Sequence, residues 1–234
     1  MVDTSDINDL DQFELMDRES ERLYKFFSSL TDEEWTPDTR CEGWRRREII
    51  SHLAGSDTYH TACLDDAVKD LFEEASEAGA TDLDAINAWQ VGKRGDRSAK
   101  EVLDEWWRLN SDVRKRMRER GRDGSMSSSV GPYPVGLMGF HLFNEYATHY
   151  DDMDGPVHES DVPQRTSDRA KIAMFAVKEA GKGKIEKLGE KYVFRAGGEE
   201  IGLSQHDFVE GVTARLPQDH SISPTLRDAL RALA

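Results

Sequence analysis

Cysteine is scarce in this sequence, which contains only Cys41 and Cys63. Two cysteines cannot form a disulfide framework, so we expect a reducing, cytoplasmic setting. Cys41 stands in a turn between Trp35 and Trp44, and Cys63 belongs to an apolar helical face. We therefore expect both cysteines to be small buried packing residues, and neither to be a nucleophile.

Positive charge is also in short supply, because 31 lysines and arginines face 46 aspartates and glutamates, which gives a net charge of -15. Nucleic-acid affinity comes largely from basic side chains that neutralise phosphates, so DNA and RNA are not expected as partners. One basic cluster lies on a predicted helix that also carries Glu119, and we interpret it as a solvated helical face without a function: Arg114, Lys115, Arg116, Arg118, Arg120 and Arg122.

Several familiar signatures are missing. The sequence has no apolar run long enough to span a bilayer, and its acidic start, MVDTSDINDLDQF, lacks the apolar core of a signal peptide, so we expect no membrane partner. It contains no GxGxxG or P-loop pattern, which argues against a nucleotide cofactor. The HExxH pattern is absent too, and this removes the simplest protease interpretation without excluding hydrolysis.

Apolar residues at helical spacing are well represented in the first two thirds of the chain. With 37% hydrophobic residues and five tryptophans, the chain should fold into a globular protein. The spacing predicts helices over about residues 10–30, 49–68, 98–117 and 135–153, and it allows a short helix over 83–89. Ser98 is the expected N-cap of the third long helix, and Glu101 is placed for a capping box.

A polar segment with Gly155, Pro156 and Pro163 predicts a linker and a domain break. We expect one domain over residues 1–155 and a small α+β domain over 165–234. In the second domain the pattern predicts a helix over 167–188, a hairpin in which KYVFRA and EEIGL flank Gly197 and Gly198, and helices over 206–216 and 224–233. The predicted fold class is mainly α.

Three residues in two separated segments offer a metal site. Glu145 and His149 are four residues apart, so a helix places them on one face with Cβ atoms about 5–6 Å apart. His52, on another predicted helix, would supply the third ligand. Two histidines and one carboxylate leave a coordination position open on zinc or a similar divalent metal, which is typical of catalytic sites.

Each of these residues also has an interpretation that does not involve a metal. A Glu and His pair at this spacing is often a simple surface pair, but here the helix is otherwise apolar, so its charged groups need a partner that offsets desolvation. His141 lies one turn before Glu145. We interpret it as a residue that hydrogen-bonds to a metal ligand, or as a hydrogen-bonded core histidine, rather than as a ligand itself. Asp152 either orients a ligand imidazole or lies exposed in the acidic end of the helix.

At these residues the chain resembles the DinB-like metal-binding superfamily, and within it the mycothiol-dependent maleylpyruvate isomerase family. The resemblance covers about the first 155 residues and is carried by the following positions: Trp35, Pro37, Thr39, Cys41, Gly43, Trp44, His52, Leu53, Ala54, Glu145, His149 and Asp152.

The resemblance implies a DinB-like four-helix bundle in which His52, Glu145 and His149 bind a divalent metal, most simply zinc, followed by a smaller α+β domain. It also implies a small-molecule substrate and a small thiol, such as mycothiol, at the open metal position. The metal-bound thiol would lose its proton and act as a nucleophile. That thiolate would either isomerise a conjugated double bond by adding, allowing rotation and leaving, or stay attached to an electrophile.

Two further classes of function compete with this one: a non-catalytic metal-binding or stress-response module, and a metal-dependent hydrolase with water at the open position. A dicarboxylate substrate would favour an arginine fork, for which Arg195, Arg215 and Arg227 are candidates, and Tyr133 lies in the loop before the metal helix. No pattern in the sequence specifies an oligomeric state.

Overall fold

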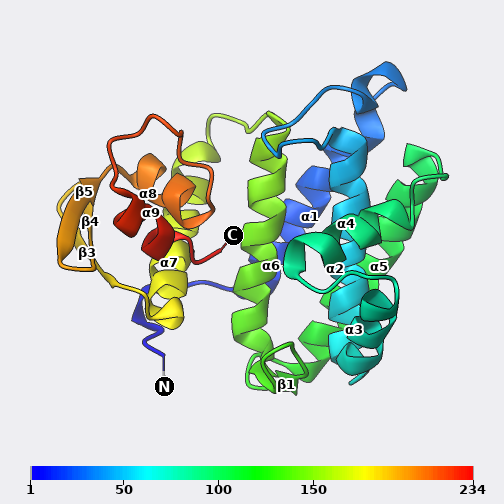
Figure 1. Cartoon of the computed structure of the whole chain (residues 1–234), viewed down its shortest axis with the longest axis horizontal. Coiled ribbons are helices and arrows are strands. Elements are labelled where there is room, and N and C mark those ends of the chain that lie inside the picture. Colours follow the sequence, from blue (N-terminus) through cyan, green and yellow to red (C-terminus); the bar gives the residue numbers. More distant parts are fainter. Residues whose placement is uncertain (1, 234) are drawn as a thin grey trace. The chain divides into compact units, whose positions relative to one another are not determined.

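The computed structural model describes residues 2–233, which divide into two compact units (Figure 1). One unit comprises residues 12–155, and the other joins residues 2–11 to residues 156–233. Residues 2–11 therefore group with the C-terminal residues. The expected division into 1–155 and 165–234 instead assigned them to the first domain. The independence of these parts as folding domains stays a prediction.

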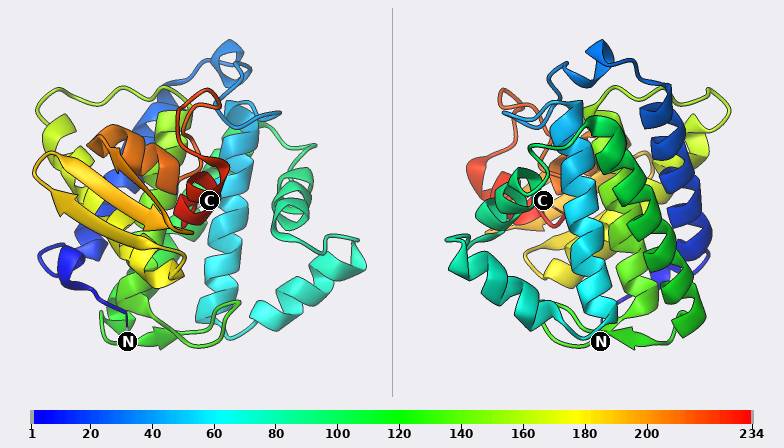
Figure 2. Two further views of the ribbon diagram at one scale, coloured as in Figure 1. Left: turned by 60° about the vertical axis from the view of Figure 1, so that its left-hand side comes forward. Right: turned by 90° about the vertical axis from the view of Figure 1, so that its right-hand side faces the viewer.

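The first unit contains a bundle of four long helices, whose arrangement Figures 1 and 2 show. These are α1 (Gln12–Ser29), α2 (Arg46–Leu64), α5 (Ala99–Arg120) and α6 (Val135–Asp152). Helix α1 packs against α6 and α5, while α2 packs chiefly against α5. Large, fully buried side chains fill the space between the helices: Phe27, Trp106, Phe140, Phe143 and Tyr146.

Helix α5 begins where its sequence predicts. The Ser98 side chain accepts a hydrogen bond from the Glu101 backbone N–H, and the Glu101 carboxylate accepts one from the Ser98 backbone N–H. This capping box pairs two backbone donors that the first turn of a helix would otherwise leave unsatisfied. The expectation for this helix is confirmed, and the helix ends at Arg120, before Gly121.

The predicted helix over 49–68 is wrong at its end. Helix α2 stops at Leu64, and α3 (Val68–Glu77) follows after a turn in which Asp66 adopts a positive φ of 58°. Aspartate tolerates this left-handed conformation better than most residues, so an Asp-Asp pair can break a helix. The apolar spacing continues across the break because α3 buries a stripe of its own, formed by Val68, Leu71 and Ala75.

The short helix expected over 83–89 is present as α4 (Leu83–Gly92), which packs on α2. Gly55 permits this close approach, because a Cβ atom there would lie 2.7 Å from Cβ of Gln90. Two short antiparallel strands, β1 (Ser125–Met126) and β2 (Tyr133–Pro134), precede α6, and a 3-10 turn over Glu33–Trp35 precedes α2.

The second unit contains a three-stranded antiparallel sheet in the order β3 (Lys184–Leu188), β4 (Lys191–Ala196), β5 (Glu199–Leu203). Helices α7 (Val162–Ala180), α8 (Gln205–Val212) and α9 (Pro224–Leu230) contact the sheet or one another. Between residues 2 and 11, the 3-10 turn over Ser5–Ile7 packs on α7. Tyr192 stacks on Phe208 in the core, with ring centroids 4.7 Å apart.

The expected helix over 167–188 is misplaced at both ends. It begins at Val162, because Pro163 fits the first turn, where a missing N–H costs no hydrogen bond. It ends at Ala180, because Gly181 adopts the left-handed conformation, φ 64°, that commonly terminates helices. Residues 184–188 form strand β3 instead. The predicted hairpin is present as β4 and β5, and the two helices expected after it are present but shorter.

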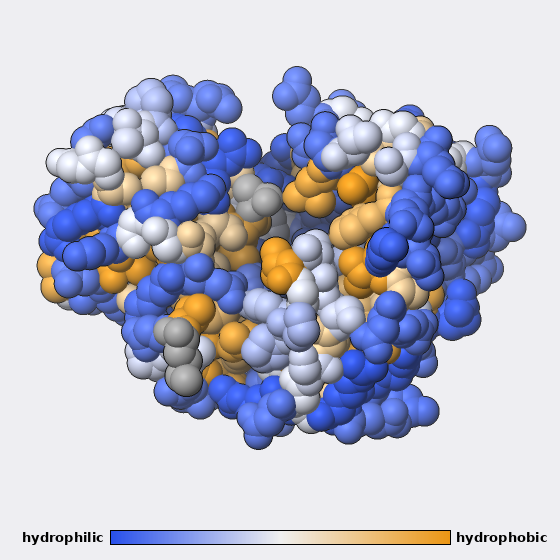
Figure 3. Space-filling model, turned by 60° about the horizontal axis from the view of Figure 1, so that its bottom comes forward, coloured by the Kyte–Doolittle hydropathy of each residue, from blue (hydrophilic) through white to orange (hydrophobic). Residues whose placement is uncertain are grey.

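Hydrophilic side chains cover most of the face that Figure 3 shows, and apolar ones appear there in small groups. This agrees with the 33% of charged residues in the sequence. Among the described residues, no helix combines the length and the apolar character that crossing a membrane requires.

Candidate metal centre

His52, Glu145 and His149 meet in the helical bundle. Helix α2 carries His52, and α6 carries the other two residues one turn apart. Nε2 of His52 lies 2.9 Å from Oε1 of Glu145, and Nε2 of His149 lies 3.9 Å from the same oxygen. The nearest candidate ligand atoms of the three side chains all lie within 4.8 Å of one another. The structure thus brings together the three residues that the sequence groups as ligands.

The three side chains differ in exposure. His52 and His149 are buried, with 7% of each residue exposed, whereas a third of the Glu145 side chain, 33%, is exposed. Of the three side chains, that of Glu145 is therefore the most accessible to solvent. Trp44 lies against His52, with ring centroids 5.0 Å apart, and helps to hold that imidazole in place.

Asp152 supports His149 from the opposite side of its ring. It is 1% exposed, and its Oδ2 lies 3.1 Å from His149 Nδ1. A carboxylate is only an acceptor, so the proton of this bond is on Nδ1, and Nε2 faces Glu145. This is the arrangement in which a carboxylate orients a metal-binding imidazole. The buried position does not match the alternative of an exposed Asp152.

Cys41 adds a second donor to the same carboxylate. Its Sγ donates to Oδ2 of Asp152 at 3.1 Å and lies 3.8 Å from Nδ1 of His149. The turn that holds Cys41 is anchored on the end of α6, because the Arg40 backbone N–H donates to the Asp152 carbonyl at 3.0 Å. The expectation that Cys41 is a buried packing residue is wrong, since the residue is only partly buried and contacts this polar group.

Cys41, His149 and Asp152 also form a group whose atoms are close enough to hold a metal ion. Their donors and acceptors already satisfy one another, however, through the two hydrogen bonds to Asp152 Oδ2. We therefore interpret this second group as the support of His149. Cys63, in contrast, is buried as expected, and burial raises the pKa of its thiol to about 11 despite the opposing hydrogen bond with Tyr59.

Electrostatics favours opposite charges within the cluster. Burial alone would raise the pKa of Glu145, but the hydrogen bond from His52 and the charges of His52 and His149 lower it to about 2. Burial alone would lower the pKa of His149, but hydrogen bonds to Asp152 and Cys41 and the charge of Glu145 raise it to about 10. The carboxylates thus make this a place that attracts positive charge.

A deeper polar group, Asp57, Asn110 and Tyr146, has no counterpart in the sequence predictions. Each of the three residues is fully buried, at 0% exposure. A signal for Asn110 exists in the sequence, because it occupies a core position of the apolar stripe that Trp106 and Val113 continue on α5. Asp57 lies among the buried residues of α2, one and a half turns after His52.

The remaining candidates from the sequence have hydrogen-bond partners of their own. His141 pairs with Tyr133, whose hydroxyl lies 2.9 Å from His141 Nε2. Each of the three candidate arginines has a partner in the second unit: Arg195 bonds to Glu186 and Glu200, Arg215 bonds to the Thr213 carbonyl among its partners, and Arg227 bonds to the carbonyls of Leu216 and Pro217. In the basic cluster of α5, Arg114 and Arg118 pair with Asp17, and Arg116 pairs with Asp65.

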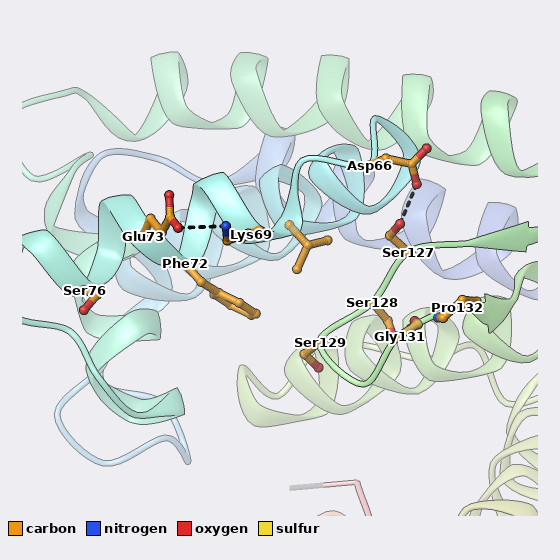
Figure 4. Close-up of a pocket in the computed structure, with 11 residues that line it drawn as sticks. Asp66, Lys69, Phe72, Glu73, Ser76, Ser127, Ser128, Ser129, Gly131 and Pro132 are labelled. Carbon is orange, nitrogen blue, oxygen red and sulfur yellow. Dashed lines mark hydrogen bonds and ion pairs between the residues drawn. The ribbon is translucent and has the colours of Figure 1, made fainter.

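A cleft elsewhere in the bundle unit lies between α3 and the loop that joins β1 to β2 (Figure 4). None of the three candidate ligands lines it. Its charged groups are already paired, because Lys69 lies 3.4 Å from Glu73 and Ser127 donates to Asp66 (Figure 4). The cleft therefore lacks the ligand set of a metal site, and the three-residue cluster is the candidate functional site.

Comparison with known proteins agrees with this geometry. The family model described as mycothiol maleylpyruvate isomerase N-terminal domain matches residues 16–154. The crystal structure of a mycothiol-dependent maleylpyruvate isomerase superposes with a TM-score of 0.62 at 16% identity, and that of its H52A mutant with 0.64 at 15%. Both alignments cover 92% of each chain. At this identity they establish the fold, which is DinB-like as predicted. No curated protein matches the chain.

Proposed function

Because this chain belongs to the mycothiol maleylpyruvate isomerase N-terminal domain family, we propose that it is a metal-dependent enzyme that uses a small thiol. The thiol, mycothiol or a related molecule, reacts with a small electrophilic substrate that contains a conjugated double bond. The reaction is a cis-trans isomerisation or a transfer of the thiol. The observation that supports this proposal is the convergence of His52, Glu145 and His149 on a partly exposed point.

The three residues fit a divalent metal by their chemistry and spacing. Two atoms that each lie about 2 Å from one zinc ion are at most about 4 Å apart. The separations of 2.9 and 3.9 Å from Glu145 Oε1 to the two imidazole nitrogens meet this limit. All three donors lie within 4.8 Å of one another, so a bound ion would only need to draw the two imidazoles slightly together. Nε2 of His52, Oε1 of Glu145 and Nε2 of His149 would hold the ion. A zinc ion with three protein ligands lowers the pKa of a thiol at its open position.

The protein side chains orient the ligands for this task. Asp152 accepts the Nδ1 proton of His149, so the Nε2 lone pair is directed to the site. Cys41 donates to the same carboxylate and holds it in place. The partial exposure of Glu145 leaves room for a thiol to approach, while the burial of both imidazoles keeps water away from the other sides.

The chemistry needs no net oxidation or reduction. The thiolate forms a carbon–sulfur bond at the double bond, and the displaced electron pair moves to the conjugated carbonyl oxygen. Rotation about the new single bond follows. When the pair returns, the double bond reforms and the thiolate leaves. If a proton instead traps the adduct, the thiol remains attached and the outcome is a transferase reaction.

The test combines metal analysis with a thiol panel. Wild-type protein should contain about one equivalent of divalent metal and turn over maleylpyruvate, or a simple electrophile, with mycothiol, bacillithiol or glutathione. The His149→Ala variant should lose both metal and activity, whereas a matched change of an exposed histidine in the second unit, His206→Ala, should lose neither. Turnover of an ester or amide without thiol would favour a hydrolase, and bound metal without any turnover would favour a non-catalytic module.

A further inference from the structure

The polar group behind the metal cluster links three helices of the bundle. Tyr146, on α6, donates its hydroxyl proton to Oδ1 of Asp57, on α2, at 2.9 Å. Asn110, on α5, donates from Nδ2 to Oδ2 of Asp57 at 3.1 Å and to the Tyr146 hydroxyl at 2.9 Å. All three side chains are fully buried, so no water competes for these bonds.

This group connects two helices, α2 and α6, that each pack chiefly on other helices. Helix α2 packs chiefly on α5, and α6 packs chiefly on α1, yet the candidate ligands lie on α2 and α6. Tyr146 directly follows Glu145, and successive residues of a helix point about 100° apart, so one side chain of the pair reaches into the core while the other faces His52. The bond from Tyr146 to Asp57 therefore ties the two ligand-bearing helices together.

A fourth residue, Arg114, determines which way the side-chain amide of Asn110 faces. Nε of Arg114 donates to Oδ1 of Asn110 at 2.7 Å, so the amide nitrogen of Asn110 must face Asp57. Burial raises the pKa of Asp57 to about 7, although hydrogen bonds from Asn110 and Tyr146 oppose this effect. An apolar core would avoid the desolvation of a carboxyl group, so a buried polar group of this kind is better explained by specificity than by stability.

We propose that Asp57, Asn110 and Tyr146 are positioning residues, which set the separation of α2 from α6 and hence that of His52 Nε2 from Glu145 Oε1. The consequence for metal affinity rests on the proposed function. The consequence for the hydrogen bond between His52 and Glu145 does not, because that bond is made by the protein alone.

The principal test is Tyr146→Phe, which keeps the buried ring and removes only the hydroxyl group. We expect zinc affinity to fall about 10-fold, which is the lower end of the loss that follows when a direct hydrogen-bond partner of a metal ligand is removed. We also expect altered d–d absorption bands in the cobalt-substituted protein, because these bands report ligand geometry. In protein stripped of metal with a chelator, the imidazole ¹⁵N signals of His52 should show a weakened bond to Glu145.

The matched control is Tyr59→Phe on α2. This change also removes one hydroxyl group, which accepts a bond from the Ser129 backbone N–H at 3.0 Å, but it does not affect any link to α6. Zinc affinity, the cobalt spectrum and the His52 signals should match wild type. A general loss of packing would change both variants alike, whereas a positioning role changes only Tyr146→Phe.

A second variant keeps the test decisive if Tyr146→Phe does not fold. Asp57→Asn preserves the shape of the side chain but places an amide donor near the donors of Asn110 and Tyr146, so it should reproduce the three changes. Folded variants with wild-type zinc affinity, cobalt spectrum and His52 signals would overturn the inference. If wild-type protein binds no zinc, the proposed function fails, and the His52 signals of the stripped variants still decide the positioning role.

Discussion

Removal of the Asp152 carboxylate should weaken metal binding in two measurable steps. In Asp152→Asn the amide oxygen still accepts the proton of His149 Nδ1, but the negative charge is lost, and charge-assisted hydrogen bonds are roughly twice as strong as neutral ones. In Asp152→Ala no acceptor remains for the donors that Oδ2 receives at 3.1 Å from His149 and at 3.1 Å from Cys41. The unsatisfied imidazole is then free to rotate.

The expected magnitudes follow from the range for outer partners of metal ligands, which is about 10-fold to 100-fold in affinity. We expect about 10-fold, or about 1.4 kcal/mol, for Asp152→Asn and about 100-fold, or about 2.7 kcal/mol, for Asp152→Ala. The Arg40 backbone N–H donates to the backbone carbonyl of Asp152, and this bond does not depend on the Asp152 side chain. The turn that holds Cys41 should therefore remain packed on the end of α6 in both variants.

The assay is a competition titration of stripped protein against a chromophoric zinc chelator. Asp154→Asn is the matched control, because Asp154 is an exposed aspartate two residues away, and asparagine accepts its positive φ of 54°. The control should bind zinc like wild type. Wild-type affinity in the Asp152→Ala variant, with unchanged circular dichroism, would refute the assignment of Asp152 as the support of His149.

Three further predictions concern the linker, the cysteines and pH. Limited proteolysis should cut first between residues 153 and 161, which connect α6 to α7 without helical structure, and an initial cut within α6 would contradict this. Iodoacetamide at neutral pH should modify partly buried Cys41 and spare Cys63, because burial raises the Cys63 pKa to about 11; mass spectrometry decides. In stripped protein the contribution of Glu145 and His149 to the free energy of unfolding should be highest between about pH 4.5 and 6.5. The part from Glu145 is lost as pH falls from 4.5 towards its folded pKa of about 2, and the part from His149 is lost as pH rises from 6.5 towards its folded pKa of about 10. Urea titrations should show this profile in the difference between wild type and the Glu145→Gln variant, and a difference that does not vary with pH would contradict it.

The bundle could be predicted from the sequence because its helices carry long apolar stripes and, for α5, a complete capping box. The errors arose where a backbone conformation overrides periodicity. Asp66 at positive φ separates α2 from α3, and Gly181 ends α7 before residues that pair as strand β3. Such breaks depend on single residues whose neighbours still fit a helical pattern, so periodicity does not detect them.

The candidate ligands could be grouped from the sequence because Glu145 and His149 share a helical face and His52 lies on a second apolar helix, and the resemblance supported the same grouping. The role of Cys41 beside His149 could not be predicted in this way. It requires the turn over residues 38–45 to pack on the end of α6, where Asp152 lies 111 residues after Cys41 in the sequence. Spacing within one helix is local information, whereas this contact depends on tertiary structure. Cys41 consequently looked like a packing residue.

The two proposed supports of the candidate metal cluster, Asp152 and Tyr146, should act independently, and their independence can be measured. Asp152 bonds to His149 and would act on its tautomer and orientation, whereas Tyr146 bonds to Asp57 and, by our proposal, acts on the separation of α2 from α6. The two residues are six positions apart on α6, or about 9 Å along the helix axis, and no hydrogen bond described above joins their groups.

Substitutions that act on independent variables at this distance usually add in free energy. The double variant Asp152→Asn with Tyr146→Phe should therefore lose zinc affinity by the product of the two single losses. A loss no larger than that of either single variant would show that both changes act through one displacement of α6, and the separate roles would have to be abandoned.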